Sequence, residues 1–81
     1  MEKRIAVVGI SIEDRDEASK KVNEILNMYG DIIVGRMGIP YKERNVSVIS
    51  LIVDGSNDKI GALTGKLGNL SKVKSKVSIM Y

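Results

Sequence analysis

The order of strand-like and helix-like segments in this 81-residue chain predicts an α+β fold, the ferredoxin-like β-α-β-β-α-β sandwich. Two segments have apolar residues at helical spacing, and four segments rich in β-branched residues surround them. Together they form two successive β-α-β halves. Because β-α-β crossovers are right-handed, this order gives a four-stranded antiparallel sheet with both helices on one face. We expect residues 1–81 to form this single domain.

The first half begins with a strand and continues with a helix. The segment RIAVVGISI, residues 4–12, is apolar and β-branched, which is typical of a buried strand. Asp14 is the expected N-cap of the helix, Asp16 suits its first turn, and Gly30 is expected to end it in a left-handed conformation. The apolar stripe of this helix consists of Ala18, Val22, Ile25, Leu26 and Tyr29.

The middle of the chain predicts an antiparallel hairpin. Its strands are DIIVGRMGI, residues 31–39, and NVSVISLIV, residues 45–53, joined by the short loop PYKER. Pro40 cannot donate a hydrogen bond to a sheet, so we expect strand pairing to end there. Arg36 has the same parity as Val34, and its side chain should therefore leave a face that is otherwise apolar.

The second half ends with a helix and a half-exposed strand. Ser56 or Asn57 is the expected N-cap of this helix. Its apolar stripe consists of Ile60, Leu63, Leu67 and Leu70. The final segment KVKSKVSIMY alternates apolar residues with lysine and serine, as a half-exposed strand does. We expect the second and fourth strands to be the edges, where lysines protect an exposed strand from pairing with another chain.

The composition excludes several kinds of chemistry. The chain has no cysteine and no histidine, which removes disulfides, thiolate and imidazole catalysis and the donors that transition metals prefer. We therefore expect no metal, no cofactor and no enzymatic activity. The longest apolar run is too short to span a bilayer and no signal-type segment follows the charged N-terminus, so we expect a cytoplasmic protein without membrane contact.

Both faces of the inner strands are apolar, although helices should cover only one face of the sheet. In a chain this small, the second face is expected to meet another copy, giving a dimer or tetramer. Glycines in the second helix suggest close approach of another backbone, a mobile helix, or only a weak helix held by packing. The residues predicted for the interface are Ile5, Val7, Ile49, Leu51, Val53, Gly61 and Gly65.

The glycine- and arginine-containing segment before the hairpin loop has two interpretations. It is either an irregular strand with a solvated arginine, or the wall of a site where glycines expose the backbone and Arg36 binds a carboxylate or phosphate. The second interpretation predicts a small anionic or amino-acid ligand. The residues predicted to bind it are Gly35, Arg36, Met37, Gly38, Pro40 and Tyr41.

Basic residues dominate the C-terminal third of the chain. All ten acidic residues lie at or before Asp58, whereas five lysines follow it. Clustered lysines suggest nucleic-acid binding, but this fold binds RNA through aromatic residues on its central strands, and those strands have none. Protection of an edge strand is the preferred interpretation. A nucleic-acid-binding protein and a structural adaptor remain the alternative functions.

Three segments resemble the family of iron-only hydrogenase system regulators. They are RIAVVGISIEDR at the start, YGDIIVGRMGIPYKERNVSVISLIVD in the middle and ALTGKLGNL before the closing strand. The resemblance implies a ferredoxin-like fold related to ACT domains and to the C-terminal domain of nickel-responsive regulators. It also implies an oligomeric, ligand-sensing module linked to hydrogenase maturation or regulation. The chain lacks the His and Cys ligands that hold nickel in those regulators, so we do not expect that metal.

Overall fold

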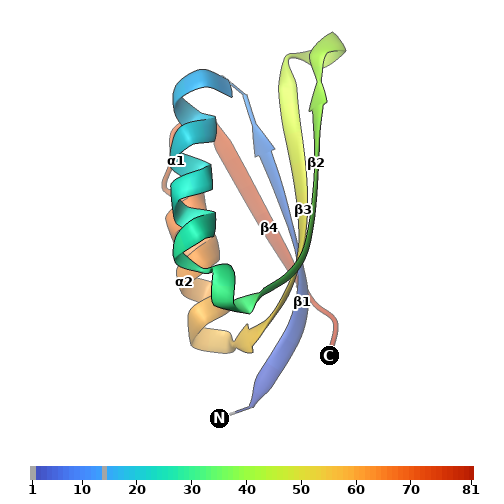
Figure 1. The fold of residues 1–81 in the computed structure, drawn as a ribbon, viewed down its shortest axis with the longest axis vertical. Coiled ribbons are helices and arrows are strands. Elements are labelled where there is room, and N and C mark those ends of the chain that lie inside the picture. Colours follow the sequence, from blue (N-terminus) through green and yellow to red (C-terminus); the bar gives the residue numbers. More distant parts are fainter. Residues whose placement is uncertain (1, 14) are drawn as a thin grey trace.

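The chain folds into one antiparallel sheet covered by two helices (Figure 1). The computed structural model describes residues 2–13 and 15–81, and the side chains of all of these except Arg15 and Asp16. The sheet order is β2-β3-β1-β4. The elements are β1 (Lys3–Ile12), α1 (Arg15–Met28), β2 (Ile33–Tyr41), β3 (Val46–Ser56), α2 (Asn57–Gly68) and β4 (Val73–Ile79). This topology confirms the predicted ferredoxin-like fold, with the second and fourth strands at the edges.

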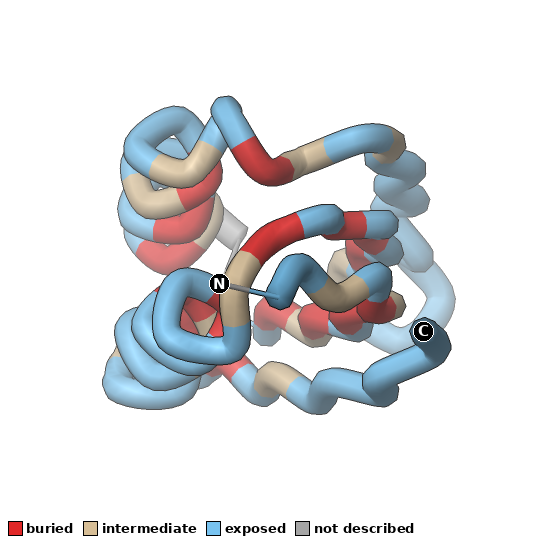
Figure 2. Tube along the Cα trace, turned by 90° about the horizontal axis from the view of Figure 1, so that it is seen from below, coloured by how far each residue is buried: buried red, intermediate tan, exposed pale blue. Residues whose placement is uncertain are grey.

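The core lies between the two helices and one face of the sheet. Seen along the long axis, the helices form one layer and the strands the other, and the buried residues lie where the layers meet (Figure 2). Among the described residues no polar or charged residue is fully buried in this core, although the Oγ atom of the half-buried Ser75 is shielded from solvent. The predicted stripes of both helices face it. The core consists of Ala6, Val8, Ile10, Ile12, Ala18, Val22, Leu26, Ile32, Ile49, Leu51, Val53, Ile60, Leu63, Leu67 and Val73.

The ends of the helices differ in how well the sequence predicts them. Ser56 is the N-cap of α2, where its Oγ accepts a hydrogen bond from the Lys59 backbone N–H at 3.2 Å. The predictions for Asp14 and Asp16 lie outside the described residues. The left-handed conformation predicted for Gly30 is wrong: α1 ends at Met28, and Gly30 begins a right-handed 3-10 turn, Gly30–Ile32. That turn continues the chain inward and places Ile32 in the core.

The hairpin is longer than predicted. Pairing does not end at Pro40, because Pro40 pairs with Ser47 and Tyr41 pairs with Val46. Proline is tolerated there because β2 is an edge strand, on which one side needs no backbone donor.

A β-bulge in β2 corrects a second prediction. The register shifts between Ile33 and Gly35, so Val34 is an extra residue in the strand. Arg36 therefore does not share a face with Val34. It pairs with Leu51, whose side chain is buried, and so it lies on the face that the helices cover.

The face of the sheet away from the helices, here called the outer face, is uncovered and largely apolar. Its apolar residues are Ile5, Val7, Met37, Ile39, Tyr41, Val46, Val48 and Ile52. Of the residues predicted for an interface, Ile5 and Val7 lie here. The prediction is wrong for Ile49, Leu51 and Val53, because these three side chains are buried beneath the helices and present no surface.

Candidate functional site

Arg36 lies in a cleft between α1 and the hairpin. Its Nη2 donates a hydrogen bond to Asn23 Oδ1 of α1 at 2.7 Å. Among the described residues no carboxylate lies within ion-pair distance of the guanidinium, whose side chain is exposed. The cleft has a volume of about 170 Å³ and is lined by Ile12, Ser19, Asn23, Arg36, Gly38, Ile39, Pro40, Ser47 and Ile49.

The sequence builds this cleft through the bulge and through one missing side chain. The bulge at Val34 turns Arg36 towards α1. Two residues later Gly38 pairs with Ile49 on the same face. A Cβ at Gly38 would lie 3.5 Å from Ile49 Cγ1, which is an ordinary contact distance. A side chain therefore fits the backbone at Gly38 but would occupy the cleft, and glycine leaves this space open.

The structure divides the predicted ligand-binding residues between the two faces of β2. Arg36, Gly38 and Pro40 line the cleft. The register places the other three, Gly35, Met37 and Tyr41, on the outer face. Tyr41 there borders a larger hollow of about 440 Å³, together with Glu13, Arg44, Asn45, Val46 and Val48. The six residues therefore do not form one site.

Sequence reasoning missed the residues that α1 contributes to the cleft. Ser19 and Asn23 are four residues apart, so they lie next to each other on the helix surface. Both carry uncharged polar side chains beside the apolar stripe of a helix whose exposed side is otherwise highly charged. That change from charged to uncharged polar residues was the available signal.

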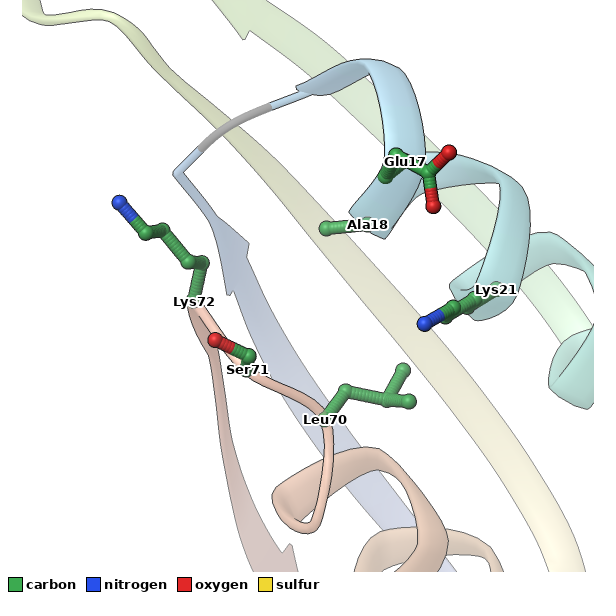
Figure 3. Close-up of a pocket in the computed structure, with 6 residues that line it drawn as sticks. All are labelled: Glu17, Ala18, Lys21, Leu70, Ser71 and Lys72. Atoms are coloured by element: carbon green, nitrogen blue, oxygen red, sulfur yellow. The ribbon is translucent and has the colours of Figure 1, made fainter.

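A second hollow, of about 190 Å³, lies between α1 and the connection from α2 to β4 (Figure 3). Its charged side chains do not converge. Glu17 and Lys72 point to opposite sides, away from the space between Ala18 and Leu70 (Figure 3). Lys72 has a φ of 68°, and its carbonyl accepts a hydrogen bond from the Glu13 backbone N–H at 2.9 Å. This arrangement closes the junction of β1 with β4 and offers no set of groups aimed at one ligand.

One ion pair joins the start of α2 to the turn after α1. Lys59 Nζ donates a hydrogen bond to Asp31 Oδ2 at 2.6 Å, and this bond lowers the pKa of the Asp31 carboxyl below its usual value. Both side chains are more than half exposed, so water screens the pair and it adds little stability. We interpret it as a structural contact.

The glycines predicted for an interface lie on the exposed side of α2. A Cβ at Gly61 or at Gly65 would have no atom within 4 Å. Packing against the rest of the chain therefore does not explain these glycines.

Two further classes of site are not found in the described part of the chain. Residues 2–13 and 15–81 contain no group of three or more acidic, His or Cys side chains that could hold a metal ion. No helix within those residues is long and apolar enough to cross a membrane.

Comparison with known proteins supports the fold and assigns a family. No protein of curated function matches the chain. The structure of the uncharacterized protein TM1266 from Thermotoga maritima is similar, with 41% sequence identity, a TM-score of 0.96, and coverage of 99% of this chain and 100% of that one.

Two more distant structures share the fold alone. The ACT domain of GTP pyrophosphokinase from Chlorobium tepidum has a TM-score of 0.80 at 16% identity, covering 95% of this chain and all of that domain. A protein from Galdieria sulphuraria has a TM-score of 0.70 at 16% identity, covering 99% of this chain and 46% of that one. Residues 4–77 match the model of the TM1266-like family, described as an iron-only hydrogenase system regulator, and the chain belongs to this family.

Proposed function

We propose that this protein is a homo-oligomeric regulatory module that senses a small anionic ligand, either an inorganic anion or an amino acid bound by its carboxylate. It performs no catalysis and acts in the maturation or regulation of iron-only hydrogenase. The family description and the ACT-like fold support the regulatory role. The ligand and the oligomer are our own inferences from the geometry.

The observation that carries the ligand proposal is that Arg36 has no carboxylate partner among the described side chains. Its contact in the cleft is with the neutral amide of Asn23, so the positive charge keeps no carboxylate partner among the described residues. A guanidinium has five N–H donors in a planar fork, and most of them stay free for a carboxylate or phosphate. The hydroxyls of Ser19 and Ser47 line the same cleft and supply further hydrogen bonds.

The size of the cleft suits a small ligand. Its volume of about 170 Å³ is smaller than the roughly 300 Å³ at which sites for drug-sized molecules begin. This favours an amino acid, phosphate or sulfate over a nucleotide. The outer face supports the oligomer, because contiguous exposed apolar surface of this extent marks an interaction surface.

Thermal unfolding with added ligands tests the proposal. Phosphate, sulfate, the amino acids and nucleotides are each added to the purified protein. At ten times Kd a ligand raises the free energy of unfolding by about 1.4 kcal/mol, which raises Tm by roughly 6–11 °C in a domain of this size.

Arg36→Ala should abolish the shift, whereas Arg44→Ala, which removes an exposed arginine from the hairpin tip, should retain it. A shift that Arg36→Ala leaves intact, or no shift with any of these compounds at millimolar concentration, would contradict the proposal.

A further inference from the structure

In two neighbouring rows of the outer face, large apolar side chains stand at the β2 edge and lysines at the β4 edge. The register aligns the four strands in rows that start at β2 and end at β4. One row contains Ile39, Val48, Ser11 and Lys74, and the next contains Met37, Ser50, Gly9 and Lys76. Each of these two rows begins with a large apolar side chain at β2, passes a small residue of β1, Ser11 or Gly9, and ends with a lysine at β4.

The small residues leave a hollow in the half of the outer face that β1 and β4 form. It has a volume of about 300 Å³ and is lined by Gly9, Ile10, Ser11, Val48, Lys74 and Lys76. A Cβ at Gly9 would have no atom within 4 Å. In the other half, Met37 and Ile39 project from β2 with 66% and 54% of their surface exposed. Projection and hollow thus lie on opposite sides of the midline of one sheet face.

We propose that a second copy of this chain covers the outer face, related by a two-fold axis that runs roughly parallel to the strands. Such an axis reverses the strand order in the facing sheet and brings β2 of one copy over β1 and β4 of its partner. Met37 and Ile39 of each copy then fill the hollow at Gly9 of the other. The contact is made twice, as an isologous interface requires. This inference specifies the oligomer of the proposed function and rests on it.

The lysines decide between the two ways in which two such faces can meet. An axis perpendicular to the strands would place β4 over β4 and bring Lys74 and Lys76 against the same residues of the partner. Like charges brought together in an interface oppose association. With the axis parallel to the strands, the lysines of the two copies lie at opposite edges. Their aliphatic stems pack on β2 while their ammonium groups reach water.

The apolar area of the outer face suits a dimer. Six of its eight apolar side chains each expose between 38% and 66% of their surface, which amounts to roughly 600 Å² per copy, and a standard interface buries about 800 Å² per partner. The stems of the lysines add to this area. A second copy of the chain therefore fits the surface in size as well as in shape.

Filling the hollow is the first test, with the oligomeric state measured by sedimentation velocity. Gly9→Leu changes no charge, and the free space around Gly9 lets the monomer fold. We expect the dimer to weaken at least about tenfold, because the added side chain occupies the space that Met37 and Ile39 of the partner need. Gly61→Ala, on the exposed side of α2, is the matched control and should leave the dimer unchanged. Circular dichroism verifies that both variants fold.

Crosslinking determines the direction of the axis. Because the chain has no cysteine of its own, only the introduced cysteines react. Facing sheets lie about 10 Å apart, too far for a disulfide, so a short bismaleimide is used. Ile39→Cys and Lys74→Cys proteins, one carrying a size tag, are mixed. We expect crosslinks between the two different variants and few within either one alone.

Each outcome has a separate meaning. A strict monomer at micromolar concentration would overturn this inference together with the oligomer of the proposed function. A dimer that Gly9→Leu strengthens or leaves unchanged, that Gly61→Ala dissociates, or in which Ile39→Cys crosslinks mainly to itself would overturn this inference alone. The response of Tm to anions through Arg36 is independent of all these results.

Discussion

Substituting Gly55 by alanine should destabilise the protein, because Ile32 occupies the space that the new methyl group needs. A Cβ at Gly55 would lie 3.0 Å from Ile32 Cγ2 and 3.3 Å from Ile32 Cβ. Ile32 is buried, and its Cβ is fixed by the backbone of the 3-10 turn, so rotation of the side chain cannot relieve both contacts. Among the described glycines, Gly55 alone has a neighbour this close.

The magnitude follows from two opposing effects. Overpacking a core costs about 1–3 kcal/mol, whereas replacing glycine by alanine restricts the unfolded chain and returns about 0.4–1 kcal/mol. We expect a net loss of about 1–2 kcal/mol, which lowers Tm by roughly 4–16 °C in a domain of this size. Gly61→Ala is the matched control, because the added methyl group would have no atom within 4 Å. The substitution also replaces a glycine in the interior of a helix. It should raise the free energy of unfolding by about 1 kcal/mol.

Urea unfolding of four proteins tests the reasoning. The unsubstituted chain, Gly55→Ala, Ile32→Ala and the double variant form a cycle that isolates the interaction between the two positions. In the Ile32→Ala background the Cγ2 and Cδ1 atoms are gone, so Gly55→Ala should lose most of its cost. If Gly55→Ala costs as much in that background as in the unsubstituted chain, contact with Ile32 is not the reason for the glycine.

Two further predictions concern single polar groups. Because the hydrogen bond from Lys59 holds the pKa of Asp31 below its usual value, the pair contributes stability above the pKa of the unfolded state. That contribution should be lost as the pH falls through the folded pKa, so Tm should decline more steeply below pH ~4 in the unsubstituted chain than in Asp31→Asn. The Oγ of Ser75 is buried and has no hydrogen-bond partner among the described residues, so Ser75→Ala should stabilise by about 1 kcal/mol in urea unfolding; a loss of stability would imply a partner for this hydroxyl.

The fold could be predicted because each element has its own local signal. The stripes of α1 and α2 and the cap at Ser56 are short-range patterns, and the right-handed crossover rule turned their order into a topology.

No such local signal showed which residues of β3 face the helices. Residues of both parities are apolar in this strand, and only the pairing of Leu51 with Val8 of β1 determines which set meets the helices. Ile49, Leu51 and Val53 were therefore assigned to the wrong face.

The candidate site was predicted in part for a similar reason. Arg36 and Gly38 stood out as residue types that expose donors and backbone, and both line the cleft. The bulge at Val34 left no mark in the sequence, because a bulged strand and a regular one can share the same residues. Without it the side to which Arg36 points could not be known, and Asn23 on another element could not be matched to it.

The single extra residue at Val34 also determines which face of the sheet each later residue of β2 joins. Successive residues of β2 face opposite sides, with Arg36, Gly38 and Pro40 towards the cleft and Met37, Ile39 and Tyr41 towards the outer face. If Val34 paired as an ordinary strand residue, without the bulge, every later residue of β2 would exchange faces, with arginine and proline in the uncovered apolar surface and methionine beneath α1. Deleting Val34 would remove the bulge and leave the pairing from Gly35 onward unchanged, whereas inserting one further residue between Gly35 and Tyr41 would change the facing of the residues beyond it. Loop grafts, circular permutations and inserted tags should accordingly be placed in the Lys42–Arg44 turn or at the termini, where a change in length leaves the facing of β2 intact.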